Sequence, residues 1–139
     1  METKKMGHRI VVRLDKGEEV LTSLKMIAEE YDIHLASVQA LGATNHVTVG
    51  LLDIQEKKYY SHTLDKDLEI TSLIGNITRK DQQVYLHLHI NVADMENHVF
   101  GGHLNECIIS ATCEMFIDVI DGEVTRKFDE VTGLNLFEF

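Results

Sequence analysis

Residues 85–104 have the sequence YLHLHINVADMENHVFGGHL, and this stretch decides how the rest of the chain is interpreted. Within it, and starting one residue earlier, the segment 84–92 alternates between apolar side chains and polar or aromatic ones. Side chains of a strand point alternately to its two faces, so Leu88 and its apolar neighbours share one face. His87 and His89 share the opposite face. The pattern therefore predicts a strand whose histidines lie off the hydrophobic core.

Strand patterns also occupy most of the chain on both sides of this stretch, separated by turn-forming residues. A short turn containing glycine and asparagine is expected to join residues 34–43 to residues 46–54. The dipeptide Asp121-Gly122 predicts a tight hairpin turn after the longest apolar strand. The expected strands are residues 8–14, 34–43, 46–54, 57–64, 68–78, 84–92, 99–104, 107–120, 123–131 and 134–139.

One segment, residues 18–31, has helical periodicity instead. Val20, Leu24 and Ile27 recur three or four residues apart, and glutamates and a lysine occupy the outer face. One principal helix against a large, mainly antiparallel sheet predicts the α+β fold class. The chain has no proline, no low-complexity tract, no convincing repeat and no change in composition that would mark a linker. We therefore expect a single domain over residues 1–139.

Charge and hydrophobicity limit the function classes. The 139 residues include 23 acidic and 13 basic side chains, which gives a formal net charge of −10. Such a field repels phosphate backbones, and the basic residues are scattered, so direct nucleic-acid binding is disfavoured without being excluded. No apolar run approaches the ~20 residues that span a bilayer, and the first residues do not resemble a signal peptide. We expect a cytoplasmic protein with no membrane partner.

The two cysteines, Cys107 and Cys113, lie in one apolar segment, CIISATC. In a strand they would be roughly 20 Å apart at ~3.3 Å per residue, which is too far for a disulfide between them. They are interpreted as small, buried thiols in a reducing compartment. A catalytic cysteine is the less favoured alternative, because nothing nearby would lower a thiol pKa.

The histidines form the main candidate site. Two strand residues that share a face have Cα atoms roughly 6.5–7 Å apart, so the rings of His87 and His89 can approach one ion. His103 is the natural third ligand, since Gly101 and Gly102 would let the chain fold back closely after the loop. Three imidazoles suit Zn²⁺ or another divalent transition metal and leave a position open for chemistry. In the alternative interpretation, the histidines only decorate a solvated or interface face.

The other polar candidates are weaker. His98 lies in a polar loop and is expected to be exposed. Glu106 is the nearest carboxylate beyond that loop, but carboxylates are abundant in this chain, so it is a weak candidate for a general base. The catalytic residues are therefore left unknown. The remaining histidines have no second ligand at a useful spacing and are interpreted as structural or surface residues: His8, His34, His46 and His62.

The run HLHINVADMENHVFGGHL resembles the signature of the plant-and-prokaryote-conserved domain, abbreviated PPC or PCC. LGATNHVTVGLLD, LEITSLIGNIT and RKFDEVTGLNLFEF fit the same pattern, so the resemblance extends from about Arg9 to Phe139. It implies an α+β domain that assembles as a homotrimer, with a metal, commonly zinc, held at His87, His89 and His103. Plant members carry an Arg-Gly-Arg AT-hook, which this sequence lacks, so the resemblance is to the prokaryotic stand-alone type.

Three possible functions follow. The first is a trimeric metal-binding domain, with a small-molecule ligand or catalysis at the metal left open. The alternative is a DNA-associated or protein-recruiting regulatory module in which the histidines are structural. A third option is a trimer that binds a metabolite without chemistry. Whether the protein is an enzyme is left open.

Overall fold

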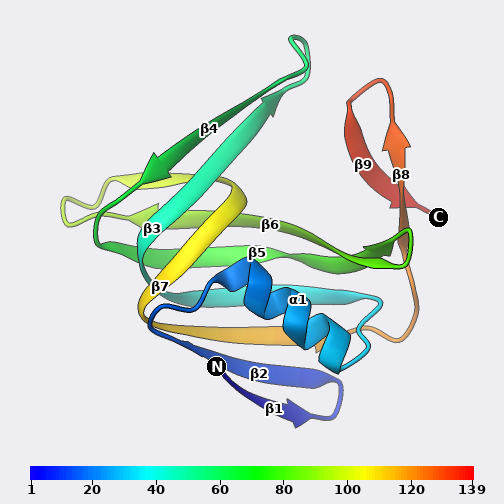
Figure 1. The fold of residues 1–139 in the computed structure, drawn as a ribbon, viewed down its shortest axis with the longest axis horizontal. Coiled ribbons are helices and arrows are strands. Elements are labelled where there is room, and N and C mark those ends of the chain that lie inside the picture. The colour runs from blue at the N-terminus through cyan, green and yellow to red at the C-terminus, as the bar shows by residue number, and fades with distance from the viewer.

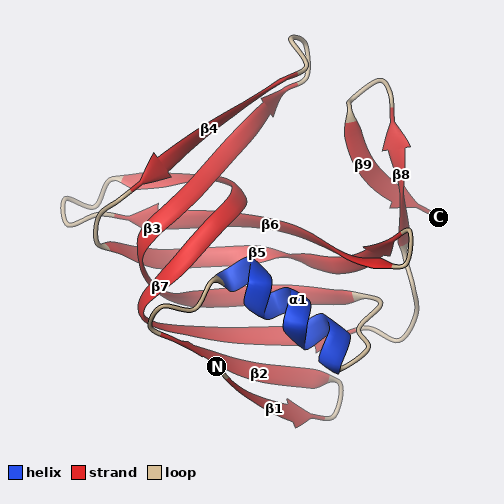
Figure 2. Ribbon diagram, in the orientation of Figure 1, coloured by secondary structure: helices blue, strands red, loops and turns tan.

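The structure is a computed structural model that describes all residues, 1–139. It contains one helix, α1 (Val20–Glu30), and nine strands, as Figures 1 and 2 show. The helix is not long and apolar enough to cross a membrane. The strands are β1 (Glu2–Met6), β2 (Arg9–Asp15), β3 (Ala36–Asp53), β4 (Lys58–Leu64), β5 (Leu68–Lys80), β6 (Gln83–Ala93), β7 (Val99–Val119), β8 (Thr125–Asp129) and β9 (Leu134–Glu138).

Seven of the strands form one antiparallel sheet in the order β1-β2-β7-β6-β5-β3-β4. An additional pairing joins β7 to β3, so that β3, β5, β6 and β7 form a closed ring of neighbours. β8 and β9 form a separate hairpin beside this sheet, visible in orange and red in Figure 1. The expected α+β class, with a mainly antiparallel sheet and one helix, is confirmed.

α1 packs its apolar stripe against the sheet, where Leu24 and Ile27 are fully buried. The Glu19 carboxylate caps the helix N-terminus by accepting hydrogen bonds from the backbone N–H groups of Leu21 and Thr22. One face of the sheet and this helix enclose a core of 25 buried residues. The opposite face of the sheet has no helix over it (Figure 1).

β3 corrects the expected turn between residues 34–43 and residues 46–54. The chain continues as one strand because β5 and β7 pair with its two edges, and the extra residues form β-bulges. A Cβ at Gly42 would collide with the backbone of Thr112 and Cys113. The buried hydroxyl of Thr44 donates to the carbonyl of Ile108, 2.6 Å away. This buried polar group therefore has a hydrogen-bond partner inside the irregular segment. Glycine and asparagine here mark bulges instead of a turn.

Two further expectations were wrong. The two strands expected at residues 99–104 and 107–120 are one strand, β7 (Val99–Val119), since Glu106 stays paired with Thr48 of β3. The hairpin across Asp121-Gly122 does not form, because both edges of this part of β7 are already paired, with β2 and with β3. The chain leaves the sheet and β8 pairs with β9 instead. The N-terminal strand β1, which pairs with β2, was not expected.

Candidate metal centre

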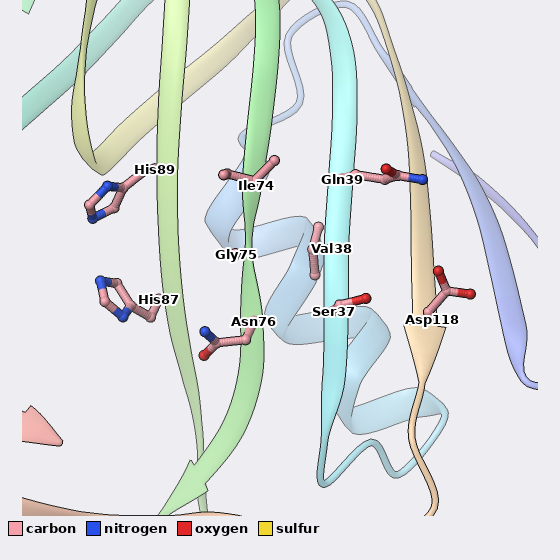
Figure 3. A pocket seen from close by; sticks show the side chains of 9 residues that line it. All are labelled: Ser37, Val38, Gln39, Ile74, Gly75, Asn76, His87, His89 and Asp118. Carbon is pink, nitrogen blue, oxygen red and sulfur yellow. The ribbon is translucent and has the colours of Figure 1, made fainter. Parts of the chain in front are cut away.

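His87 and His89 lie on β6 and point away from the core, as the alternation predicts. Leu88 and Ile90 on the same strand are each 1% exposed and belong to the core. In the close view of Figure 3, both imidazoles stand on the face of the sheet opposite to α1. The local sequence alone therefore sets the direction of these two ligands.

His103 reaches them through strand pairing. β6 and β7 pair over five residues, and His103 is the direct partner of His89. Glycines make this close pairing feasible. A Cβ at Gly101 would collide with the Asn91 side chain, and one at Gly102 would lie 2.8 Å from the carbonyl oxygen of Gly50. The expectation that the two glycines let His103 approach the other histidines agrees with this geometry.

The three imidazoles form a compact triangle. The ring centroids are 5.2 Å apart for His87 and His89, 5.4 Å for His87 and His103, and 5.6 Å for His89 and His103. One ring nitrogen from each lies within 4.8 Å of the other two. Nitrogens that each bind one zinc ion at ~2.0–2.1 Å are at most about 4.2 Å apart, so small side-chain rotations suffice. The donor set fits a divalent transition metal.

The environment favours neutral imidazoles. Burial is the main cause that lowers the pKa of His87, followed by the repulsion that His103, His89 and Arg126 exert on its protonated form. Burial also lowers the pKa of His103, with His89 adding to the effect. No carboxylate is among the groups that shift either pKa. A neutral imidazole has a free lone pair, so the lowered pKa of His87 and of His103 favours the state that binds metal.

Two residues beside the histidines were missed by the sequence analysis. Arg126 of β8 is buried and donates from Nη2 to the Asn76 side-chain oxygen at 2.8 Å. Tyr59 of β4 lies edge-on to His103, with ring centroids 6.5 Å apart, and its hydroxyl donates to Asn105. Both come from elements remote in sequence from the histidines, and no local pattern indicates them.

A pocket of about 470 Å³ opens beside His87 and His89 on the outer face of the sheet (Figure 3). Its walls come from β3, β5, β6 and β7, and its polar groups are mostly neutral. It is lined by Ser37, Val38, Gln39, Ile74, Gly75, Asn76, His87, His89 and Asp118. His103 lines a second hollow, of about 610 Å³, together with Glu106 and the first turn of α1. The histidines thus lie next to two cavities.

Glu106 does not join the histidine cluster. Its carboxylate lies 3.4 Å from Nε2 of His46, whose other ring nitrogen contacts Asp65. These two carboxylates raise the pKa of His46, with Asp65 the larger cause. His46 is thereby a member of a surface ion-pair array, in line with its structural or surface interpretation. Nothing in this geometry makes Glu106 a base for the histidine site.

His98 is exposed, as expected. It forms a second group of ligand-type side chains with Asp94 and Glu96 in the loop between β6 and β7. However, the Asp94 carboxylate already accepts from Lys66 and from the backbone N–H groups of residues 96 and 98. These hydrogen bonds hold the loop in a defined turn, which explains why the three side chains lie close together.

The protein matches known proteins over most of its length. The model of the Plants and Prokaryotes Conserved (PCC) domain matches residues 1–121. Among curated proteins, the bifunctional protein GlmU of a Synechococcus strain is 30% identical over 125 residues, which is 88% of this chain but 18% of that protein. The chain thus spans about a fifth of the curated relative that it matches.

Two solved structures are similar over nearly the whole chain. A candidate DNA-binding protein from Bacteroides thetaiotaomicron has a TM-score of 0.97 at 29% identity, covering 99% of this chain and 96% of that one. A metal-containing protein from Archaeoglobus fulgidus has a TM-score of 0.90 at 34% identity, covering 97% and 96%. With the domain match over residues 1–121, these findings show that the chain belongs to the PCC domain family.

Proposed function

We propose that the protein binds one divalent transition metal per chain through His87, His89 and His103, and that it acts as a homotrimer. The observation that carries this proposal is the triangle of imidazoles, whose nitrogens lie within 4.8 Å of one another. Zn²⁺ is the expected ion on availability, since imidazole also suits Cu, Fe, Ni and Co. The similar Archaeoglobus fulgidus protein contains a metal, which supports the proposal.

Three protein ligands would leave a position for water or a small molecule, as in catalytic zinc sites. A bound ion there would polarise a carbonyl group or lower the pKa of a bound water. The adjoining pocket of about 470 Å³ supports this role, because a purely structural zinc is usually closed by four protein ligands. The proposal therefore includes a small-molecule ligand at the metal and leaves its reaction open.

The test is metal content. Protein purified without chelator should contain about one metal per chain by elemental analysis, and His89→Ala should lose it. His98→Ala is the matched control, since that exposed histidine lies outside the triangle, and it should retain the metal. If wild type stays metal-free after loading with Zn²⁺, Ni²⁺ or Co²⁺, the proposal is refuted.

Exposed apolar side chains support the oligomer. Leu41 of β3 and Phe116 of β7 are 56% and 40% exposed, and Phe116 pairs with Gln39, which lies two residues before Leu41 on the same face. Residues paired across strands share a face, so these apolar groups gather on the outer side of the sheet. Patches of this kind mark protein contacts. Analytical ultracentrifugation should give three times the chain mass of 15.8 kDa, and Phe116→Glu should reduce it.

DNA association is the second candidate, because the similar Bacteroides thetaiotaomicron protein is described as a candidate DNA-binding protein. The net charge of −10 opposes it, since phosphate contacts dominate the affinity for DNA. A gel shift with random and genomic DNA fragments at physiological salt distinguishes a DNA-binding function from the metal-binding one. Tight, sequence-specific binding that persists in the His89→Ala variant would favour the regulatory module over the metal centre.

A further inference from the structure

We propose that the open position of the metal centre binds the carboxylate group of a small organic acid, whose carbon skeleton lies in the pocket over Ile74. This inference rests on the metal binding proposed above. It concerns the ligand, which the histidine triangle alone does not define.

The charge of the centre is the first argument. Imidazole ligands are neutral, and no carboxylate belongs to the cluster of His87, His89 and His103. The charged side chain outside the cluster that acts on His87 is a second cation, the guanidinium of Arg126. A bound dication would therefore carry uncompensated positive charge, which favours an anion in the open position.

The acidic groups around the site are engaged elsewhere. Asp118, at the far side of the pocket, pairs with Arg9 of β2. Glu106, in the hollow beside His103, pairs with His46. Glu19, the other acid that lines that hollow, accepts hydrogen bonds from the backbone N–H groups of Leu21 and Thr22. Each carboxylate that lines the two cavities therefore already has a partner, and an anionic ligand would supply the counter-charge.

The pocket lining is the second argument. Ser37, Gln39 and Asn76 offer neutral polar groups, and Ile74 offers an exposed apolar surface. The Asn76 side-chain oxygen accepts from Arg126, which turns the amide NH₂ away from that bond and leaves it free to donate. In Figure 3 the Asn76 side chain points from β5 toward His87. Neutral donors beside a cation, with an apolar wall, match a carboxylate on a short carbon skeleton.

The size of the pocket agrees with this class of ligand. Its volume of about 470 Å³ lies in the lower part of the range of small-molecule sites, roughly 300–1,000 Å³. Gly75 lines the pocket with its backbone alone, because it pairs with Leu88 and a side chain there would point into the core.

The test uses the protein loaded with Co²⁺, whose visible absorption changes when an anion enters its coordination sphere. Glycolate should change the spectrum in a saturable way, whereas the isosteric neutral compound glycolamide should not. Inorganic phosphate serves as the alternative anion. Cobalt content, measured separately, reports on the metal site without reference to the ligand.

Asn76→Asp tests the charge argument, because aspartate keeps the acceptor for Arg126 while adding a negative charge next to His87. The affinity for glycolate should fall at least about tenfold, with cobalt content unchanged. Gln55→Glu, on the exposed turn between β3 and β4, makes the same charge change away from the site and should have no effect. Gln39→Glu is a second pocket variant and should also weaken glycolate binding. It keeps the test usable if Asn76→Asp does not fold.

The outcomes separate the two proposals. If the wild-type protein does not bind cobalt, the metal centre itself is refuted. Cobalt binding with equal responses to glycolate and glycolamide, or with no response to either, would overturn the carboxylate inference while leaving the metal centre intact. A response to phosphate as strong as that to glycolate would also overturn the assignment to carboxylates.

Discussion

Arg126→Met is expected to release the β8–β9 hairpin from the sheet while leaving the sheet itself folded. The Arg126 residue is 8% exposed, and its guanidinium donates three hydrogen bonds. Nε donates to the Thr78 hydroxyl at 2.8 Å and Nη2 to the Asn76 side chain at 2.8 Å, both on β5. Nη1 donates to the carbonyl of Asn135 on β9 at 2.7 Å. One side chain thus joins both strands of the hairpin to the sheet.

The magnitude follows from what these groups lose. The guanidinium also lies 4.5 Å from the ring centroids of Tyr85 and Phe137, so methionine removes two cation–π contacts as well. Thr78 is fully buried and would lose its only donor, although its hydroxyl would still donate to the carbonyl of Tyr85. Hydrogen bonds to a charged group contribute roughly 1.5–3 kcal/mol each, and relief from the buried charge offsets part of their loss, so we expect a cost of about 3 kcal/mol. β8 pairs with β9 alone, so this cost should appear mainly as local opening of the hairpin.

Hydrogen exchange measures that opening. A loss of about 3 kcal/mol lowers amide protection in residues 125–138 by roughly a hundredfold or more, with β5 and β6 affected much less. Arg126→Lys keeps the charge without the planar fork and should give an intermediate loss. Lys127→Met, at the neighbouring exposed position, is the matched control. Equal protection of the hairpin in Arg126→Met and Lys127→Met would refute the reasoning.

Three other predictions concern the rest of the chain. Burial raises the thiol pKa to about 11 for Cys107 and about 12 for Cys113, so neither should react with iodoacetamide at pH 8 unless urea is added; fast labelling of the native protein would contradict this. The hydrogen bond from Lys66 is the main cause that lowers the pKa of Asp94 to about 2, so its stabilising effect is complete above about pH 4 and lost as the pH falls toward 2. Denaturation at a series of pH values should show this loss in wild type, and it should be smaller in Asp94→Asn. Gly75→Ala forces a Cβ into the backbone of β6 and should lower the free energy of unfolding by about 1–3 kcal/mol or more, and a wild-type denaturation midpoint would contradict it.

Local pattern was sufficient for the parts of the fold in which burial follows a simple period. The alternation in β6 placed Leu88 inside and His87 outside, and the periodic residues of α1 gave its buried stripe. Both elements bury one face only, so their sequences carry a strong signal. The α+β class followed from these elements together with the many strand patterns.

Strand continuity and pairing were not predictable in the same way. A glycine such as Gly42 has the same local signature in a turn and in a bulge, and the neighbouring strands decide between them. Asp121-Gly122 carries a strong hairpin signal, yet the partner edge of β7 is occupied by strands from distant parts of the chain. Arg126 illustrates the same limit for the site, since its contacts depend on where the hairpin lies.

The candidate site depends on both kinds of information. Parity on β6 directs His87 and His89 outward, but His103 joins them because it pairs with His89 across the β6–β7 ladder. A slip of one residue in that ladder would turn His103 to the other face, so the register is as important to the site as the ligands themselves. Gly101 and Gly102 hold this register, because a side chain at either position would separate β7 from β6 or from β3. The Gly-Gly-His sequence is therefore best understood as one structural unit in which two glycines position one ligand.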